Sequence, residues 1–106
     1  MSSEFIFKSA TELADQIKNK QISSVELTQA YIDQIERFDD KINAVPVRRF
    51  DRALQEEEKA DEALARGESH GPLHGVPMTI KESYVMKDTP STWGEPKNKD
   101  NVSDKD

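Results

Sequence analysis

The side chain in this sequence that is best placed to take part in a reaction is that of Lys81, which follows the short apolar run VPMTI of residues 76–80. That run comes after GPLHG at residues 71–75, a composition typical of a loop that leads into a short buried strand. Apolar neighbours at such a point can desolvate a lysine, and desolvation favours the neutral amine, which accepts protons. The competing interpretation is an ordinary lysine at the end of a strand that points into water, as most lysines do.

Two other groups of polar side chains have spacings that invite a metal-site interpretation. His70 and His74 have the H-x3-H spacing that places two imidazoles on one side of a helix. The Gly-Pro pair between them breaks a helix, however, and no third ligand is in view. The run EEE at residues 56–58 is interpreted as a solvated helix face, because consecutive helical side chains point about 100° apart and cannot converge on one ion. We therefore expect neither a metal nor another cofactor.

The stretch around Lys81 as a whole resembles a known family. GPLHGVPMTIKES, followed by TPSTWG, is similar to the opening motif of the amidase signature family of serine hydrolases. The similarity continues upstream through INAVPVRRFDRALQEEEKADEALARG at residues 42–67 and, more weakly, through ISSVELTQAYIDQIERFD at residues 22–39. Members of this family cleave carboxylic amides with a Ser-Ser-Lys triad, whose lysine follows the strand after the GPL-type turn. The resemblance implies that Lys81 is the triad lysine.

The resemblance also implies a reaction and its limit. A serine acyl-enzyme forms while the neutral lysine relays a proton through the middle serine and later returns it to the departing nitrogen. In the family the Gly/Ser-rich stretch with both serines lies well downstream, and these 106 residues contain no such run; the nearest pair, Ser23-Ser24, has no glycine beside it. The chain resembles the amino-terminal portion of an amidase, so we expect it to be inactive alone. The alternative is a non-catalytic remnant that acts as a small helical interaction module.

Three positions depart from the family pattern. Glu82 stands where many members have aspartate, which changes little. The sequence VMKDTP at residues 85–90 replaces a turn like Val-Ala-Gly-Leu-Pro and makes the loop near the site more polar. Pro46 lacks the backbone N–H that a strand position needs, at a place the family usually fills with an aliphatic residue.

Composition excludes several classes of partner. The chain has a formal net charge of −6, with 34% hydrophobic and 34% charged residues. Nucleic acids and anionic membranes are bound by clustered Lys and Arg, so we expect neither as a partner. There is no cysteine, which fits a reducing compartment. The start, MSSEFIFKSA, has no signal-peptide pattern, and we expect a cytoplasmic location.

Two capping boxes predict where helices begin. Ser9 with Glu12, and Ser23 with Glu26, each place a hydroxyl and a carboxylate three residues apart, so that both can satisfy backbone N–H groups at a helix start. The first helix is expected to end near residues 19–21 and the second at residues 39–40. The second helix carries an apolar stripe for core packing, made of Leu27, Tyr31, Ile35 and Phe38.

The middle of the chain predicts a strand and a third helix. INAVPVRRF at residues 42–50 is interpreted as a strand, placed at a sheet edge or a bulge by its proline. Asp51 is expected to cap a helix over residues 52–66, with Gly67 as the residue just after its end. Residues 95–106 are polar apart from Val102 and predict a flexible tail.

These elements predict an α/β fold class. By resemblance, residues 1–106 form an incomplete amidase domain, contributing about three helices and two short strands to a larger mixed sheet flanked by helices. The strand at residues 76–80 would lose the neighbours that bury it, so self-association through an exposed sheet edge is expected. The substrate in the full-length enzyme is a small-molecule amide; aliphatic, aromatic, peptide and tRNA-linked amides all stay open, as does the involvement of an amidotransferase partner.

Overall fold

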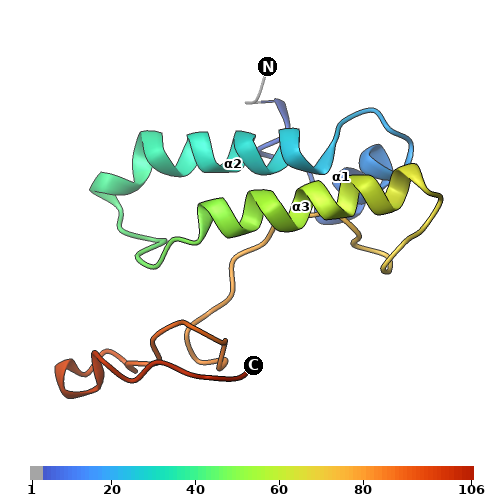
Figure 1. Ribbon diagram of the computed structural model, residues 1–106. Helices are drawn as coiled ribbons and strands as arrows, with labels where there is room; N and C mark the ends of the chain where they lie inside the picture. The colour runs from blue at the N-terminus through green and yellow to red at the C-terminus, as the bar shows by residue number, and fades with distance from the viewer. Residues whose placement is uncertain (1–3) are drawn as a thin grey trace.

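Three helices make up the ordered core of the molecule. The computed structural model describes residues 4–106, in which α1 (Ala10–Lys18), α2 (Ser24–Phe38) and α3 (Phe50–Ala65) are joined by short loops, with two 3-10 turns, η2 (Asp39–Lys41) and η3 (Pro96–Asn98). Helices α2 and α3 run side by side in opposite directions, and α1 lies next to the start of α2 and the end of α3 (Figure 1). The three predicted helices are therefore confirmed.

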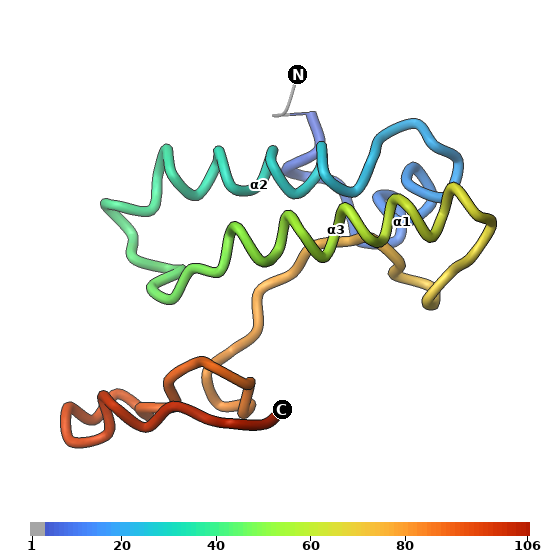
Figure 2. The backbone as a smooth tube through the Cα atoms, viewed as in Figure 1, coloured from blue at the N-terminus to red at the C-terminus, as the bar shows by residue number. Residues whose placement is uncertain are grey.

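The chain leaves this helical part after Val76, which still packs against the core. From there it runs away from the helices into an irregular carboxyl-terminal segment that lies apart from them (Figure 2). The radius of gyration is 15.3 Å, whereas a compact chain of this length has a value of about 13 Å. The molecule is thus a packed helical unit followed by an extended segment.

Both predicted capping boxes are present. The Ser9 hydroxyl accepts from the Glu12 amide at 3.2 Å and the Glu12 carboxylate accepts from the Ser9 amide at 2.8 Å. Ser23 and Glu26 repeat the arrangement at the start of α2, at 3.0 and 3.4 Å. These reciprocal bonds satisfy backbone donors that a helix cannot pair internally, which is why the helices begin at these positions.

Helix α3 begins earlier than the sequence indicates. Its first residue is Phe50, and Arg49 precedes it without a side-chain cap, so Asp51 lies in the first turn and the prediction that it caps the helix is wrong. The predicted end is confirmed. Gly67 has φ +78° and donates to Leu64 O, while Glu68 donates to Ala63 O, both at 2.9 Å. This pair of bonds is a Schellman motif.

The hydrophobic core lies under the amino-terminal half of α2. It is formed by Phe5, Leu13, Ile17, Ile22 and Leu27, with Tyr31, Leu64 and Val76 packed against it. The stripe predicted on α2 is therefore buried only at its beginning. Phe38 at its far end is 43% exposed, because α1 and the turn after α3 cover only the first part of the helix.

The strand predicted over residues 42–50 is wrong. After η2 the chain forms a loop organised by the buried Asp39, whose carboxylate accepts from the amides of Ala44 at 2.7 Å and Val45 at 3.1 Å and pairs with Arg48 at 3.2 Å. The Asp39 carboxylate thereby accepts hydrogen bonds from backbone N–H groups that would otherwise need the carbonyl groups of a neighbouring strand. Its burial raises the pKa of Asp39, but these bonds to Ala44, Val45 and Arg48 outweigh it and leave that pKa below its ordinary value.

The strand predicted over residues 76–80 is wrong as well. These residues are extended but pair with no other strand, and within residues 4–106 the β pairing consists of two isolated bridges, Lys87 with Ser103 and Pro90 with Val102. A strand needs a neighbour for its backbone groups, and an apolar run alone does not supply one. The described part of the chain is therefore helical and irregular. None of its helices has the length and apolar character that crossing a bilayer requires.

Candidate functional site

The residues that precede Lys81 form a turn held against two helices. Within this turn, residues 71–75, the His74 amide donates to Gly71 O at 3.2 Å, and just after it Val76 donates to Leu73 O at 3.0 Å. The turn lies beside the start of α2 and the last third of α3, which its contacts with Ser24 and Ala60 show. We call residues 71–75 the motif turn.

The first attachment of the motif turn is to α2. The hydroxyl of Ser24, whose residue is fully buried, lies 2.5 Å from the carbonyl oxygen of Gly75 and also contacts the Glu57 carboxyl group of α3. Gly75 has φ +79°, and a Cβ atom there would lie 3.1 Å from Ser24 Oγ and 3.2 Å from Ile17 Cγ2. The turn approaches the helices this closely because the residue has no side chain.

The second attachment is to α3 through His74. Its Nε2 lies 2.8 Å from Ala60 O, and its Nδ1 accepts from the His70 amide at 3.0 Å. A carbonyl cannot donate, so Nε2 carries the hydrogen and the imidazole is neutral in this arrangement. The two histidines therefore shape a loop. The described residues contain no group of three His, Cys, Asp or Glu side chains able to hold a metal ion.

Helix α3 also caps α2 from the side. The Asp61 carboxylate accepts from the Ser24 amide at 2.7 Å and from the Val25 amide at 3.1 Å. Together with the Ser23–Glu26 box this satisfies the free N–H groups at the start of α2, and it places a negative charge at the positive end of that helix. The cap fixes Ser24, and Ser24 in turn contacts the motif turn.

Lys81 itself lies on the extended segment that follows the motif turn. Its residue is exposed, and so are Met78 at 66% and Ile80 at 51%. Of the apolar run that is expected to desolvate the lysine, Met78 and Ile80 are thus exposed themselves, whereas Val76 packs against the helical core. In this arrangement Lys81 matches the interpretation of a lysine open to water.

The residue after Lys81 joins the two halves of the sequence motif. The Glu82 carboxylate accepts from the Thr92 amide, from the Thr92 hydroxyl at 2.5 Å and from the Trp93 amide at 3.0 Å. Hydrogen bonds from the Thr92 side chain and backbone, with that from Trp93, hold the pKa of Glu82 below its ordinary value. Glu82 therefore ties the end of GPLHGVPMTIKES to TPSTWG.

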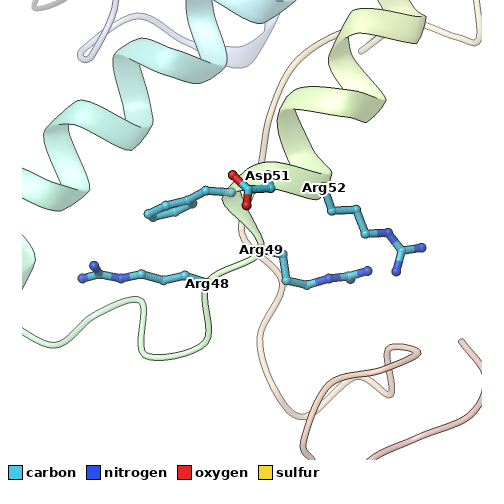
Figure 3. A pocket seen from close by; sticks show the side chains of 5 residues that line it. Arg48, Arg49, Asp51 and Arg52 are labelled. Carbon is cyan, nitrogen blue, oxygen red and sulfur yellow. The ribbon is translucent and has the colours of Figure 1, made fainter.

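An arginine-rich hollow lies elsewhere, at the start of α3. Arg48, Arg49 and Arg52 extend around it with Phe50 and Asp51, and the side chains point in different directions (Figure 3). Arg48 pairs with Asp39, and Arg52 lies 3.1 Å from Glu56 and 3.7 Å from Asp88. Arg48 thus makes an ion pair within the loop before α3, and Arg52 pairs both within α3 and with the carboxyl-terminal segment.

Comparisons with known proteins identify the family of the chain. The sequence profile of the family named Amidase matches residues 26–106. The chain therefore belongs to the amidase signature family, which confirms the resemblance. One relative, a glutamyl-tRNA(Gln) amidotransferase subunit from Moorella thermoacetica, is 42% identical over 84% of this chain and 18% of its own length.

Two further relatives carry other activities in their names. Fatty-acid amide hydrolase 2-A of Danio rerio is 35% identical over 100% of this chain and 21% of its own length. Indoleacetamide hydrolase of Bradyrhizobium diazoefficiens is 38% identical over 92% of this chain and 19% of its own length. The chain spans about a fifth of the length of these curated relatives.

Sequence reasoning missed the residues that hold the motif turn. The predicted solvated face of the EEE run is right for the exposed Glu56 and Glu58 and wrong for the partly buried Glu57. The available signal was spacing: Glu57 and Asp61 are four residues apart and lie on one face of a helix. The sequence indicates Ser24 only as a member of the Ser23-Ser24 pair, which has no glycine beside it.

Proposed function

We propose that this chain contributes the catalytic lysine of an amidase, and that Lys81 is that residue. The observation that supports this most is the position of Lys81 in the motif GPLHGVPMTIKES within residues 26–106, the part matched by the family profile. Its turn is attached to both α2 and α3. These attachments fix the position at which the segment that carries Lys81 leaves the helical unit.

The proposed reaction converts an amide and water into a carboxylic acid and an amine or ammonia. A serine hydroxyl attacks the amide carbonyl, and its proton passes through a second serine to the neutral Lys81 amine. The C–N bond breaks as that proton moves to the leaving nitrogen, and water then cleaves the acyl-enzyme. Lys81 acts as general base and then as general acid, a role that contributes about 10²–10⁴-fold to a rate.

The two serines belong, in this proposal, to residues outside these 106. No Gly/Ser-rich run occurs in the chain, and Met78 and Ile80, the apolar side chains nearest before Lys81, are exposed. Both the nucleophile and the desolvation of the lysine must therefore come from the rest of an amidase domain, whose α/β sheet would take up residues 76–80. We accordingly propose that the chain alone does not hydrolyse amides.

The proposed substrate is a small-molecule amide. The relatives are named for glutamyl-tRNA(Gln), for fatty-acid amides and for indoleacetamide. Their identities to this chain, 42%, 35% and 38%, are too close to one another to favour one of these substrates.

A chimera tests the role of Lys81. This chain replaces the matching fifth of the Bradyrhizobium indoleacetamide hydrolase, and indoleacetamide hydrolysis is measured. We expect an active chimera that loses about 10²–10⁴-fold in kcat with Lys81→Ala. The matched control is Lys87→Ala, which alters another exposed lysine on the same segment and leaves kcat unchanged. A chimera that keeps its activity after Lys81→Ala contradicts the proposal.

The chain alone supplies the second part of the test. We expect no turnover of indoleacetamide or of a fatty-acid amide by the purified 106 residues. If the chain does hydrolyse one of these amides and Ser91→Ala abolishes that activity, the chain contains its own nucleophile and the proposal is refuted. Ser91 is the serine to test because it is buried and its hydroxyl has no partner within the described residues.

A second candidate role is self-association of the chain. The extended segment exposes apolar side chains, with Met78 at 66%, Tyr84 at 71% and Val85 at 52%, and its backbone groups at residues 76–80 have no strand partner within the described residues. We propose that a second copy of the chain pairs with this segment. Analytical ultracentrifugation should show a dimer that Met78→Lys weakens, while Phe7→Lys, at a 94% exposed site before α1, leaves it intact; a monomer at all concentrations rejects the idea.

A further inference from the structure

The two hydrogen-bond contacts of the Ser24 hydroxyl need one hydrogen more than the hydroxyl itself has. This hydroxyl lies within hydrogen-bond distance of two oxygen atoms, Glu57 Oε2 and Gly75 O. A hydroxyl has one hydrogen to donate, and the Gly75 carbonyl can only accept. If Ser24 donates to Gly75, then the contact with Glu57 is a hydrogen bond only when the Glu57 carboxyl group carries a hydrogen of its own.

We infer that Glu57, Ser24 and Gly75 form a proton-operated latch that holds the motif turn against α2 and α3. In its closed form the protonated Glu57 donates to Ser24 Oγ, and Ser24 donates to Gly75 O. The latch connects three segments that are far apart in the sequence, with separations of 33 and 51 residues along the chain. It depends on no step of amide hydrolysis and stands whether or not the proposed function does.

The surroundings of Glu57 favour a neutral carboxyl group. Its burial raises the pKa of Glu57, and the nearby negative charges of Asp61 and Glu56 on α3 raise it further. The Ser24 hydroxyl of α2 and the charge that His74 of the motif turn can carry act in the opposite direction and lower it. The net result is a pKa above the ordinary value of a glutamate.

Ionisation of Glu57 opens the latch. The Ser24 hydrogen then has two acceptors, the carboxylate and the Gly75 carbonyl, and the carboxylate is the stronger one. Gly75 O loses its partner, and the motif turn loses its attachment to α2. The Asp61 cap is unaffected, because its donors are backbone amides of α2. The device therefore loosens the turn while leaving the helix start in place.

Acidification tightens the turn through Glu57, because protonation of Glu57 closes the latch. A variant at Glu57 tests this contribution.

The first measurement follows the carboxyl carbon of Glu57 by NMR in the uniformly ¹³C-labelled 106-residue chain, from about pH 3 to about pH 8, with Glu58 as the internal reference. We expect Glu57 to titrate at a higher pH than the exposed Glu58. A shared midpoint for the two residues overturns the latch. This measurement needs no variant, so it does not depend on whether a substitution folds.

The second measurement is hydrogen-exchange protection of the His74 and Val76 amides, both bonded within or next to the turn. We expect their protection factors to fall about tenfold as Glu57 ionises, the change that one hydrogen bond of ordinary strength produces. Glu57→Gln retains a donor to Ser24 and no longer ionises, so in this variant both amides should stay protected and the tenfold fall should be absent. Glu58→Gln, one position away on the exposed face, should still show the tenfold fall. A Glu57→Gln profile equal to that of the unaltered chain overturns the inference.

Discussion

Substitution of Gly75 by alanine tests the packing of the motif turn most directly. The backbone at this position has φ +79°, and an added Cβ would meet Ser24 Oγ at 3.1 Å and both Ile17 Cγ2 and Ser24 Cβ at 3.2 Å. Ser24 is 0% and Ile17 1% exposed, so neither side chain has free space into which it can move. The new methyl group must therefore displace either the turn or the helices.

Two costs and one gain determine the size of the effect. A non-glycine residue in the left-handed region costs about 1–2 kcal/mol, and forcing an extra carbon into a packed site costs about 1–3 kcal/mol. Alanine also restricts the unfolded chain, which offsets about 0.4–1 kcal/mol. The net loss in the free energy of unfolding is about 1–5 kcal/mol, with a central value of about 3, a large share of the roughly 5–15 kcal/mol that stabilises a typical domain.

Gly67→Ala is the matched control. Gly67 has φ +78° and no heavy atom within 4 Å of its added Cβ, so this variant has the backbone cost without the collision, about 1 kcal/mol after the unfolded-state gain. Urea unfolding followed by circular dichroism gives both values from midpoints at an unchanged m-value. Equal losses for the two variants would refute the packing argument, because the backbone conformation alone would then account for the effect.

Four further outcomes follow from burial and hydrogen bonding. Leu27→Ala, at a 0% exposed core position, should lower the free energy of unfolding by about 2–5 kcal/mol, whereas Leu73→Ala at a 45% exposed position should change it by about 0.5 kcal/mol or less; similar losses would mean that the core is elsewhere. Ser23→Ala removes the α2 cap and should cost about 0.5–2 kcal/mol in the same urea assay, and no loss would reject the cap. The pKa of Asp39 is lowered in the folded chain, so its contribution to the free energy of unfolding is present above the ordinary aspartate pKa and is lost as pH falls through the folded value. Urea titrations at several pH values should therefore show a smaller acid-induced loss of stability for Asp39→Asn, and an unchanged pH dependence would exclude Asp39 as a source of that loss. Lys81→Ala should leave the free energy of unfolding within about 0.5 kcal/mol of the original, and a larger loss would mean that this lysine has a structural role.

The sequence-based predictions were right mainly where the interacting residues lie close together in the sequence. The starts of α1 and α2 were predicted because the residues of a capping box are three apart and satisfy each other locally. The end of α3 was predicted because a glycine can adopt φ +78° at low cost. The start of α3 was missed by two residues, since Arg49 provides no side-chain cap that the sequence could reveal.

The two strand predictions failed for a common reason. An apolar run shows that a segment can be extended, but a strand also requires a partner, and the partner is not encoded in the run. At residues 42–50 the Asp39 carboxylate takes the backbone donors instead. At residues 76–80 no partner strand is present in the described part of the chain.

By itself, then, the sequence determined the helices, the family and Lys81 as the candidate lysine, because each depends on residues close together in the chain or on a contiguous motif. Only the tertiary structure decided what holds the motif turn in place. Ser24, Glu57 and Gly75 belong to three separate segments, and no local pattern relates them. The burial of Glu57 arises only when α2 and the motif turn pack on α3, and that packing distinguishes it from the exposed glutamates on either side.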